Sequence, residues 1–272
     1  LEKYNLESVG WGSPFLLVPE ATSLDVETRK LLAKAKEDDF YLSNISPLGV
    51  PFNSIKGVSN DFWKEKRIND NKAGSSCPKK FLALGLDAKG KPLCTASKKY
   101  QTTQLEDLTT QNLDSITFDE KSTLITDKTC LCEGLANAAI INYNLPHKGI
   151  DQGVAICPGP NVAYFTKELS LKEMVRHIYG KTNVITTTNR PHFFIKELSM
   201  YVDYFSNKVD EFQHSFTKKQ EKYLTNFKNN LNDGIGYYQQ LFSDSINNFE
   251  VSNDNLLLEL EQLRKELFEI KI

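Results

Sequence analysis

The feature that most constrains the fold is the spacing of apolar residues between positions 191 and 272. They recur mainly at intervals of three and four, first in one series and then in a second: Leu198, Val202, Phe205, Val209, Phe212, Phe216, Tyr223 and Phe227, then Leu256, Leu260, Leu263, Leu267 and Ile270. This spacing places an apolar stripe on one face of a helix. Glycine and proline are rare here, with only Pro191, Gly234 and Gly236. We predict two or three long amphipathic helices, broken at 233–236. They would form a helical hairpin or bundle, pack on a partner, or dimerise as a coiled coil.

Composition excludes several classes of protein. The 272 residues carry 33 Lys+Arg and 35 Asp+Glu, and the resulting net charge of -2 argues against a nucleic-acid partner. The 16 Phe and 11 Tyr give too much buriable surface for a disordered chain. No apolar run approaches the roughly 18 residues that span a bilayer, so we expect no membrane span. No signal-peptide pattern opens the chain, which favours a cytoplasmic location. Residue 1 is Leu rather than Met, so we expect either a trimmed start or a piece of a longer polypeptide.

The rest of the chain predicts a small mixed α/β region. Apolar runs at 15–18 and 153–157 are typical of buried strands, and 81–86 with 92–94 resemble a hairpin. Helices are expected after a cap at Thr22 or Ser23, at 59–68 and at 133–143, and after the Ser170–Glu173 capping box, with Gly180 as the stop. We therefore predict an α+β fold with three parts: residues 1–76, 77–190 and the helical 191–272.

Five cysteines lie between positions 77 and 157, each beside turn-forming or small residues: Cys77, Cys94, Cys130, Cys132 and Cys157. An odd number without a secretory pattern argues against a disulfide framework. Turns can direct several thiolates at one point, so the clustering favours a metal site, either an iron–sulfur cluster or zinc. We expect the first four as ligands and the fifth as an alternative ligand. The other interpretation is five unrelated thiols, because the spacing matches no known finger or ferredoxin.

No complete catalytic motif occurs in the chain. H-E-x-x-H, G-x-S-x-G and the P-loop pattern are all absent. The histidines lie in a loop, in a predicted helix, at a helix start and in the heptad segment: His147, His177, His192 and His214. The clearest phosphate-binding candidate is the Gly10-Trp11-Gly12-Ser13 stretch, whose backbone N–H groups are able to approach a ligand closely.

The run from Val9 to Ala21, VGWGSPFLLVPEA, followed by a capped helix, resembles the last barrel strand of nitronate monooxygenases (2-nitropropane dioxygenase-like flavoproteins). In that family a G-[ST]-x-F-L-x-x-P-E run closes a TIM barrel, and its Gly-Thr/Ser backbone contacts the FMN phosphate. The resemblance covers residues 9–40. It implies the end of a TIM-barrel-like unit, FMN contacts at Gly12 and Ser13, and further flavin strands and a catalytic histidine upstream of Leu1.

Three functions follow as expectations. The first is the C-terminal portion of an FMN-dependent oxidoreductase of nitronate monooxygenase type, acting on a small-molecule substrate. The second is a non-enzymatic scaffold with a structural metal, which binds partner helices or a second copy through residues 191–272. The third is an iron–sulfur electron carrier.

Overall fold

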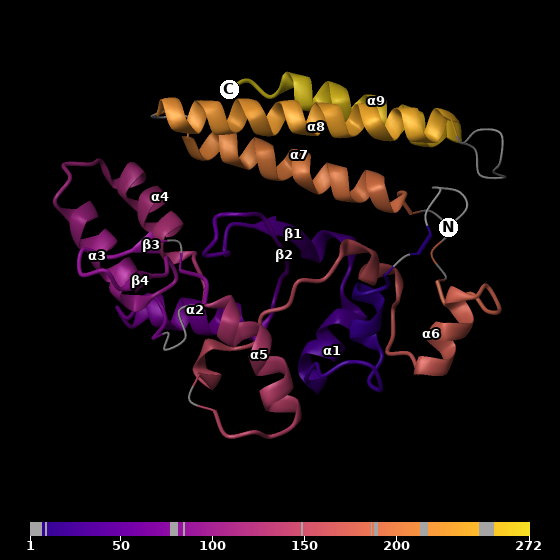
Figure 1. Ribbon diagram of the computed structural model, residues 1–272, viewed down its shortest axis with the longest axis horizontal. Helices are drawn as coiled ribbons and strands as arrows, with labels where there is room; N and C mark the ends of the chain where they lie inside the picture. Colours follow the sequence, from indigo (N-terminus) through magenta and orange to yellow (C-terminus); the bar gives the residue numbers. More distant parts are fainter. Residues whose placement is uncertain are drawn as a thin grey trace. The chain divides into compact units, whose positions relative to one another are not determined.

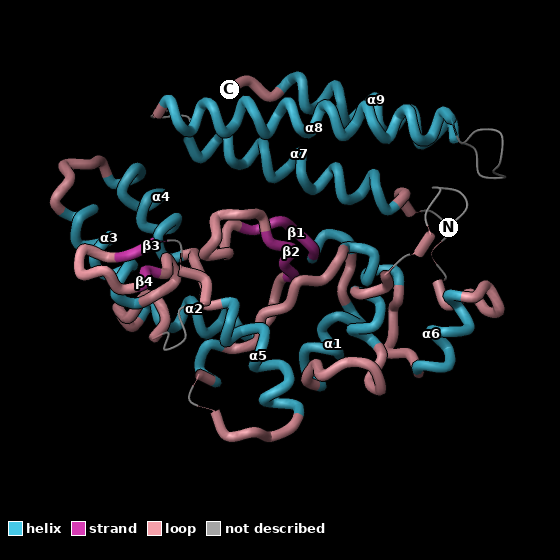
Figure 2. Tube along the Cα trace, in the orientation of Figure 1, coloured by secondary structure: helices cyan, strands magenta, loops and turns pink. Residues whose placement is uncertain are grey.

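The computed structural model describes residues 7, 8, 10–76, 81–83, 85–147, 149–185, 187, 190–212, 217–244 and 253–272. The fold is of the α+β class and mostly helical (Figure 1). Within the described residues, strands occur as two short antiparallel pairs (Figure 2). The chain divides into two compact units. One is Gly12–Thr186, and the other is Thr187–Ile272 with the segment that ends at Trp11.

The segment after Gly12 forms a 3₁₀ helix (η2, Ser13–Leu17), so the strand predicted over 15–18 is wrong. Pro14 lies at the start of this helix, where its fixed φ and missing N–H are tolerated. Phe15 N–H donates to the Gly12 carbonyl at 3.0 Å, which closes the turn. Leu17 is still fully buried, so the apolar run does enter the core, but as a turn of helix.

Helix α1 (Val26–Lys34) begins at Asp25, whose carboxylate accepts from Thr28 N–H at 3.0 Å. The predicted cap at Thr22 or Ser23 is therefore wrong. The Thr22 hydroxyl instead accepts from Leu24 N–H at 3.2 Å, which shapes the turn before the helix. A short 3₁₀ helix (η3, Glu37–Asp39) then leads into β1 (Phe40–Ser43), which pairs antiparallel with β2 (Phe52–Ile55).

The charged helix predicted at 59–68 is present as α2 (Ser59–Asn69). The predicted hairpin is present too, as β3 (Gly85–Leu86) paired with β4 (Pro92–Leu93). Asp87 holds its turn, because its carboxylate accepts from the backbone N–H groups of Lys89 and Lys91. Two further helices follow, α3 (Lys98–Thr109) and α4 (Ser115–Thr126).

Helix α5 (Leu131–Asn142) is the predicted small-residue helix, and it does pack closely. A Cβ added at Gly134 would lie 2.8 Å from the Ala155 Cβ, closer than packed carbons approach. The strand predicted at 153–157 is wrong: this buried segment is irregular and bonds to helices. Ala155 N–H donates to the Gly134 carbonyl at 2.9 Å, and the Val154 carbonyl accepts from Asn60 N–H at 3.2 Å. These bonds give Val154 and Ala155 backbone partners without a neighbouring strand.

Two 3₁₀ helices (η4, Ile150–Gln152; η5, Pro160–Tyr164) precede α6 (Leu171–Ile178). Helix α6 opens on the predicted capping box. Glu173 N–H donates to the Ser170 hydroxyl, and Ser170 N–H donates back to the Glu173 carboxylate. Gly180 follows the helix with φ of 66°, the left-handed conformation that ends helices.

The second unit contains α7 (Phe193–Phe212), α8 (Lys218–Asp244) and α9 (Asn253–Glu269), which pack on one another side by side (Figure 1). The described seam residues line their shared core, except that Tyr223 is exposed. The predicted break at 233–236 is wrong, because α8 continues through Gly234 and Gly236. Ile235 between them is fully buried, and its packing offsets the poor helix propensity of glycine. In the described part of the chain, no helix combines the length and apolar character needed to cross a bilayer.

Candidate functional site

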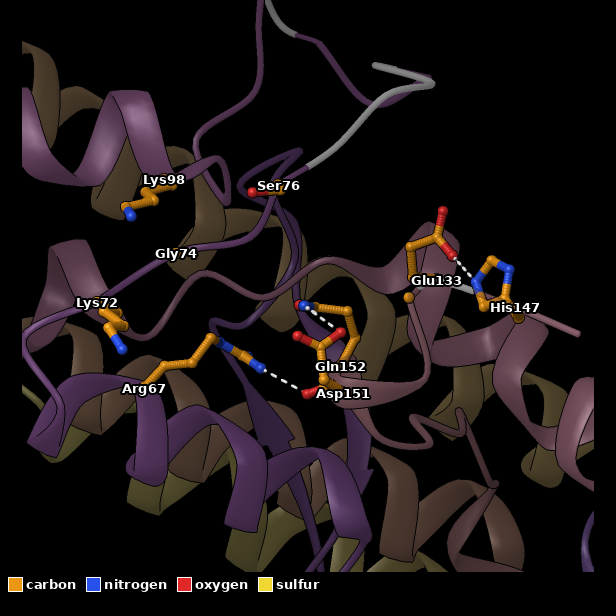
Figure 3. Close-up of a pocket in the computed structure, with 10 residues that line it drawn as sticks. Arg67, Lys72, Gly74, Ser76, Lys98, Glu133, His147, Asp151 and Gln152 are labelled. Atoms are coloured by element: carbon orange, nitrogen blue, oxygen red, sulfur yellow. Dashed lines mark hydrogen bonds and ion pairs between the residues drawn. The ribbon is translucent and has the colours of Figure 1, made fainter.

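A cavity of about 690 Å³ lies in the first unit (Figure 3). It is lined by the end of α2, the loop that follows α2, the start of α3, the first turn of α5, and residues 147, 149, 151 and 152. Its volume is within the range of small-molecule sites. Arg67, Lys72 and Lys98 lie toward one side of the view, whereas Glu133 and His147 pair on the other (Figure 3). The cavity therefore has a cationic side and an acid–imidazole side.

The acid–imidazole side is a hydrogen-bonded pair between His147 Nε2 and Glu133 Oε2. The Glu133 side chain is only 4% exposed and that of His147 is 21% exposed, so the carboxylate is buried and the ring reaches the cavity. An ionised carboxylate only accepts, so Nε2 carries the hydrogen. In the neutral ring the other nitrogen, Nδ1, then has a lone pair, and no hydrogen bond joins Nδ1 to a residue that the structure describes.

Gly149 leaves space for this pair. A Cβ built at that position would lie 2.6 Å from Glu133 Oε2 and 2.7 Å from His147 Nε2. Real Cβ atoms do not approach polar atoms so closely, so any larger residue would push the pair apart. The reason for a glycine here is the space that the pair occupies, since the backbone of Gly149 does not have a positive φ.

The cationic side is assembled from three segments. Arg67, from the end of α2, donates from Nη1 to the Asp151 carbonyl at 3.0 Å, and burial lowers the pKa of its guanidinium, against the opposing effect of the nearby Asp151. Lys72 and Lys98 are exposed, and their ammonium groups make no hydrogen bond or ion pair within the described residues. Two cations are thus available to a ligand, and a third is held in place.

Buried amides fix the floor of the cavity. Asn137 is fully buried on α5, and its Nδ2 donates to the carbonyls of Gly149 at 2.9 Å and Gly153 at 2.8 Å. Asn60 on α2 donates to the Gln152 carbonyl at 2.7 Å, and the Ser75 hydroxyl donates to the Gln152 side chain. Buried hydrogen bonds of this kind restrict the motion of a loop. Residues 149–153 are therefore held by side chains from α2, α5 and the loop that contains Ser75.

The predicted metal ligands are divided between different surroundings. Cys94 and Cys130 are buried, and Cys132 is half-buried as the second residue of α5. The segments around Cys94 and Cys130 meet at Gln101, whose Nε2 donates to the carbonyls of Thr95 and Lys128 at 3.4 and 2.8 Å. Among the described residues, no three His, Cys, Asp or Glu side chains converge as a metal site would need. Cys77 lies outside the described residues.

Cys157 has different neighbours from the other cysteines. It is on the surface, beside a small apolar pocket of about 230 Å³ lined in part by Leu135 and Ala138 of α5. Burial raises the pKa of its thiol, partly offset by a hydrogen bond from Asn53 N–H. A raised pKa disfavours the thiolate that metals bind.

The predicted FMN contacts lie at the start of the η2 helix. Gly12 is exposed, and a Cβ added there would meet no atom within 4 Å, so its backbone is open to a ligand. The Ser13 hydroxyl already accepts from Gly159 N–H at 2.8 Å. Leu169 N–H donates to the Leu17 carbonyl at 3.0 Å, so this segment is bonded to the Pro-Gly-Pro region and the residues after it.

No protein-family model matches the chain, and no curated protein or solved structure matches it either. No sequence motif marks the cavity, because its charged residues come from five separate segments. The one local signal is an acid in the first turn of a small-residue helix, Glu133, followed after that helix by the loop residue His147.

Proposed function

We propose that the first unit is an enzyme site that abstracts a proton from a small molecule bound in the cavity beside Glu133 and His147. The observation that carries this proposal is the buried carboxylate–imidazole pair on the wall of a ligand-sized cavity. A carboxylate that orients a histidine and stabilises its protonated form is the usual arrangement for a general base. His147 Nδ1 is the atom that takes the proton.

Each part has a distinct role in this proposal. Glu133 fixes the tautomer of His147, so that Nδ1 is unprotonated, and it then stabilises the imidazolium that forms. Gly149 keeps the space in which the pair meets. Asn137 holds the loop that carries Gly149, which limits the motion of the cavity floor. General base catalysis of this kind contributes about 10²- to 10⁴-fold to a rate.

The test is exchange of a substrate proton with solvent. The full chain is incubated in D₂O with a panel of small carbon acids, namely keto acids, hydroxy acids and their phosphate esters, and deuterium uptake is followed by mass spectrometry. We expect uptake into one compound class. H147Q and E133Q should slow it about 100-fold or more. H177Q, on α6 and outside the cavity lining, should not change it.

G149A is a further test variant, and it keeps every charged group of the site. Its Cβ would separate Glu133 from His147, so exchange should fall as in the two charge variants. A panel without uptake, or uptake that H147Q leaves unchanged, would overturn the proposal.

A second candidate is the C-terminal portion of an FMN-dependent oxidoreductase of nitronate monooxygenase type. The exposed Gly12 backbone favours it, because a phosphate group has room to approach there. Bound flavin would supply hydride and oxygen chemistry. The product of the full-length gene should then be yellow, with one flavin per chain. G12V should lose the flavin, and a colourless full-length product would contradict this candidate.

A metal is the third candidate, either as an iron–sulfur centre for electron transfer or as structural zinc in a scaffold. The meeting of the Cys94 and Cys130 segments at Gln101 favours it. Metal analysis should find iron with sulfide, or one zinc, and the C130S/C132S double variant should lose it. Metal-free protein that keeps its fold would contradict this candidate.

A further inference from the structure

We propose that the cationic side of the cavity binds the phosphate group of a phosphorylated small molecule, with the rest of the ligand directed toward His147. A phosphorylated small molecule would be the substrate class of the proposed enzyme site. The placement of the ligand toward His147 rests on that proposed function, whereas the phosphate contact does not. Its own observations are the Lys72 and Lys98 ammonium groups, the held Arg67 guanidinium and the backbone that brings them together (Figure 3).

The backbone between Lys72 and Ser76 packs closely against the start of α3. Gly74 has φ of 81°, and a Cβ there would lie 2.6 Å from the Lys98 Cα. Ser75 N–H donates to the Ala96 carbonyl at 2.9 Å, and Lys98 N–H donates to the Ser75 carbonyl at the same distance. Two hydrogen bonds and an obligatory glycine therefore hold the two lysine-bearing segments against each other.

The third cation, Arg67, is held by the segment that contains Asp151 and Gln152. Arg67 donates to the Asp151 carbonyl, and Asn60 bonds to the neighbouring Gln152 carbonyl. The Asp151 carboxylate accepts from the Gln152 amide at 3.3 Å. A dianion is accordingly expected nearer Lys72 and Lys98 than Asp151.

The number of donors favours phosphate over carboxylate. A phosphate monoester carries a charge of about -1.5 to -2 at pH 7 and three terminal oxygens. Two ammonium groups, one guanidinium and the Ser76 hydroxyl on the same lining match such a group. A carboxylate has one charge and two oxygens, and a single arginine suffices to bind it. Lys72 and Lys98, which form no ion pair with a described residue, would then remain unused.

The test is calorimetric titration of the full chain with inorganic phosphate and with acetate, at pH 7.5 and low salt. Phosphate should bind at least about tenfold more tightly than acetate, and its affinity should fall as salt rises. K72Q and K98Q should each weaken phosphate binding about tenfold, which corresponds to the loss of one charge-assisted hydrogen bond. Both side chains are exposed, so the fold should not change. K34Q, at the end of α1 and outside the cavity lining, is the matched control and should bind as the wild type does.

Equal affinity for phosphate and acetate, or phosphate binding that K72Q and K98Q leave unchanged, would overturn the inference. The two proposals fail separately. H147Q removes proton exchange but should change phosphate affinity less than twofold. One outcome separates the two proposals: H147Q abolishes proton exchange, but K72Q and K98Q do not change the affinity for phosphate. That outcome would support His147 as the general base and refute the phosphate site alone.

Discussion

Replacement of Gly153 by alanine should destabilise the first unit strongly. Gly153 has φ of 68°, which costs an L-residue about 1–2 kcal/mol. A Cβ there would also lie 2.6 Å from Asn60 N and 2.7 Å from the Ser59 carbonyl oxygen. Both contacts are backbone atoms at the start of α2, which have no flexible end to move away. Overpacking of this kind typically costs about 1–3 kcal/mol.

The expected loss for G153A is therefore about 2–5 kcal/mol of the free energy of unfolding. Gly49 supplies the matched control, because its φ of 73° is similar and a Cβ there would meet nothing within 4 Å. G49A should lose only the backbone contribution of about 1–2 kcal/mol. The difference between the two variants isolates the close approach of segment 153 to α2.

Calorimetric unfolding of the wild type and both variants measures this difference. At about 2–4 °C per kcal/mol for a unit of this size, G153A should melt several degrees below G49A. Equal melting temperatures would refute the reasoning, because the contact between Gly153 and Ser59–Asn60 would then carry no steric cost.

Three further predictions concern other parts of the chain. G234A should stabilise the second unit by about 1 kcal/mol in urea unfolding, because a Cβ there meets nothing within 4 Å inside α8; a loss would show that the glycine is needed. Cys157 should be alkylated before Cys94 and Cys130, at a rate that rises from pH 7 to 9, because those two are buried and burial raises the pKa of the Cys157 thiol; earlier labelling of Cys94 would contradict this order. Burial also raises the pKa of Asp61 above its ordinary 3.8, so the folded state binds that proton more tightly and stability should increase as the pH falls through the folded pKa. D61N should reduce this increase in urea unfolding compared at pH 7 and pH 5, and an unchanged slope would contradict it.

Local patterns fixed the elements that depend on nearby residues alone. The 3–4 spacing of leucine and aromatic residues predicted the long helices, and the Ser170–Glu173 box predicted the start of α6. The sequence also predicted the turn around Asp87, because its hydrogen bonds join residues within four positions of one another. In each case the interacting groups lie within a turn or two along the chain, so the sequence carries the whole signal.

The errors share a different physical cause. The apolar runs at 15–18 and 153–157 indicated burial correctly for residues 17, 18 and 153–156 but not the backbone partner, because a run of this length has no period that distinguishes strand from turn. The partners turned out to be distant: Val154 bonds to Asn60, and Leu17 bonds to Leu169. Gly234 and Gly236 indicated a break that the packing of buried Ile235 prevented.

The sequence by itself determined an α+β chain with a cysteine-bearing middle and a helical tail, because composition and periodicity are local properties. The candidate site was decided only by tertiary structure. Its cations come from residues 67, 72 and 98 and its acid–imidazole pair from 133 and 147, positions with no common motif. Glycines with no room for a Cβ, at 74, 134, 149 and 153, allow those segments to meet. Such proximity depends on contacts between separate elements, which no spacing along the chain encodes.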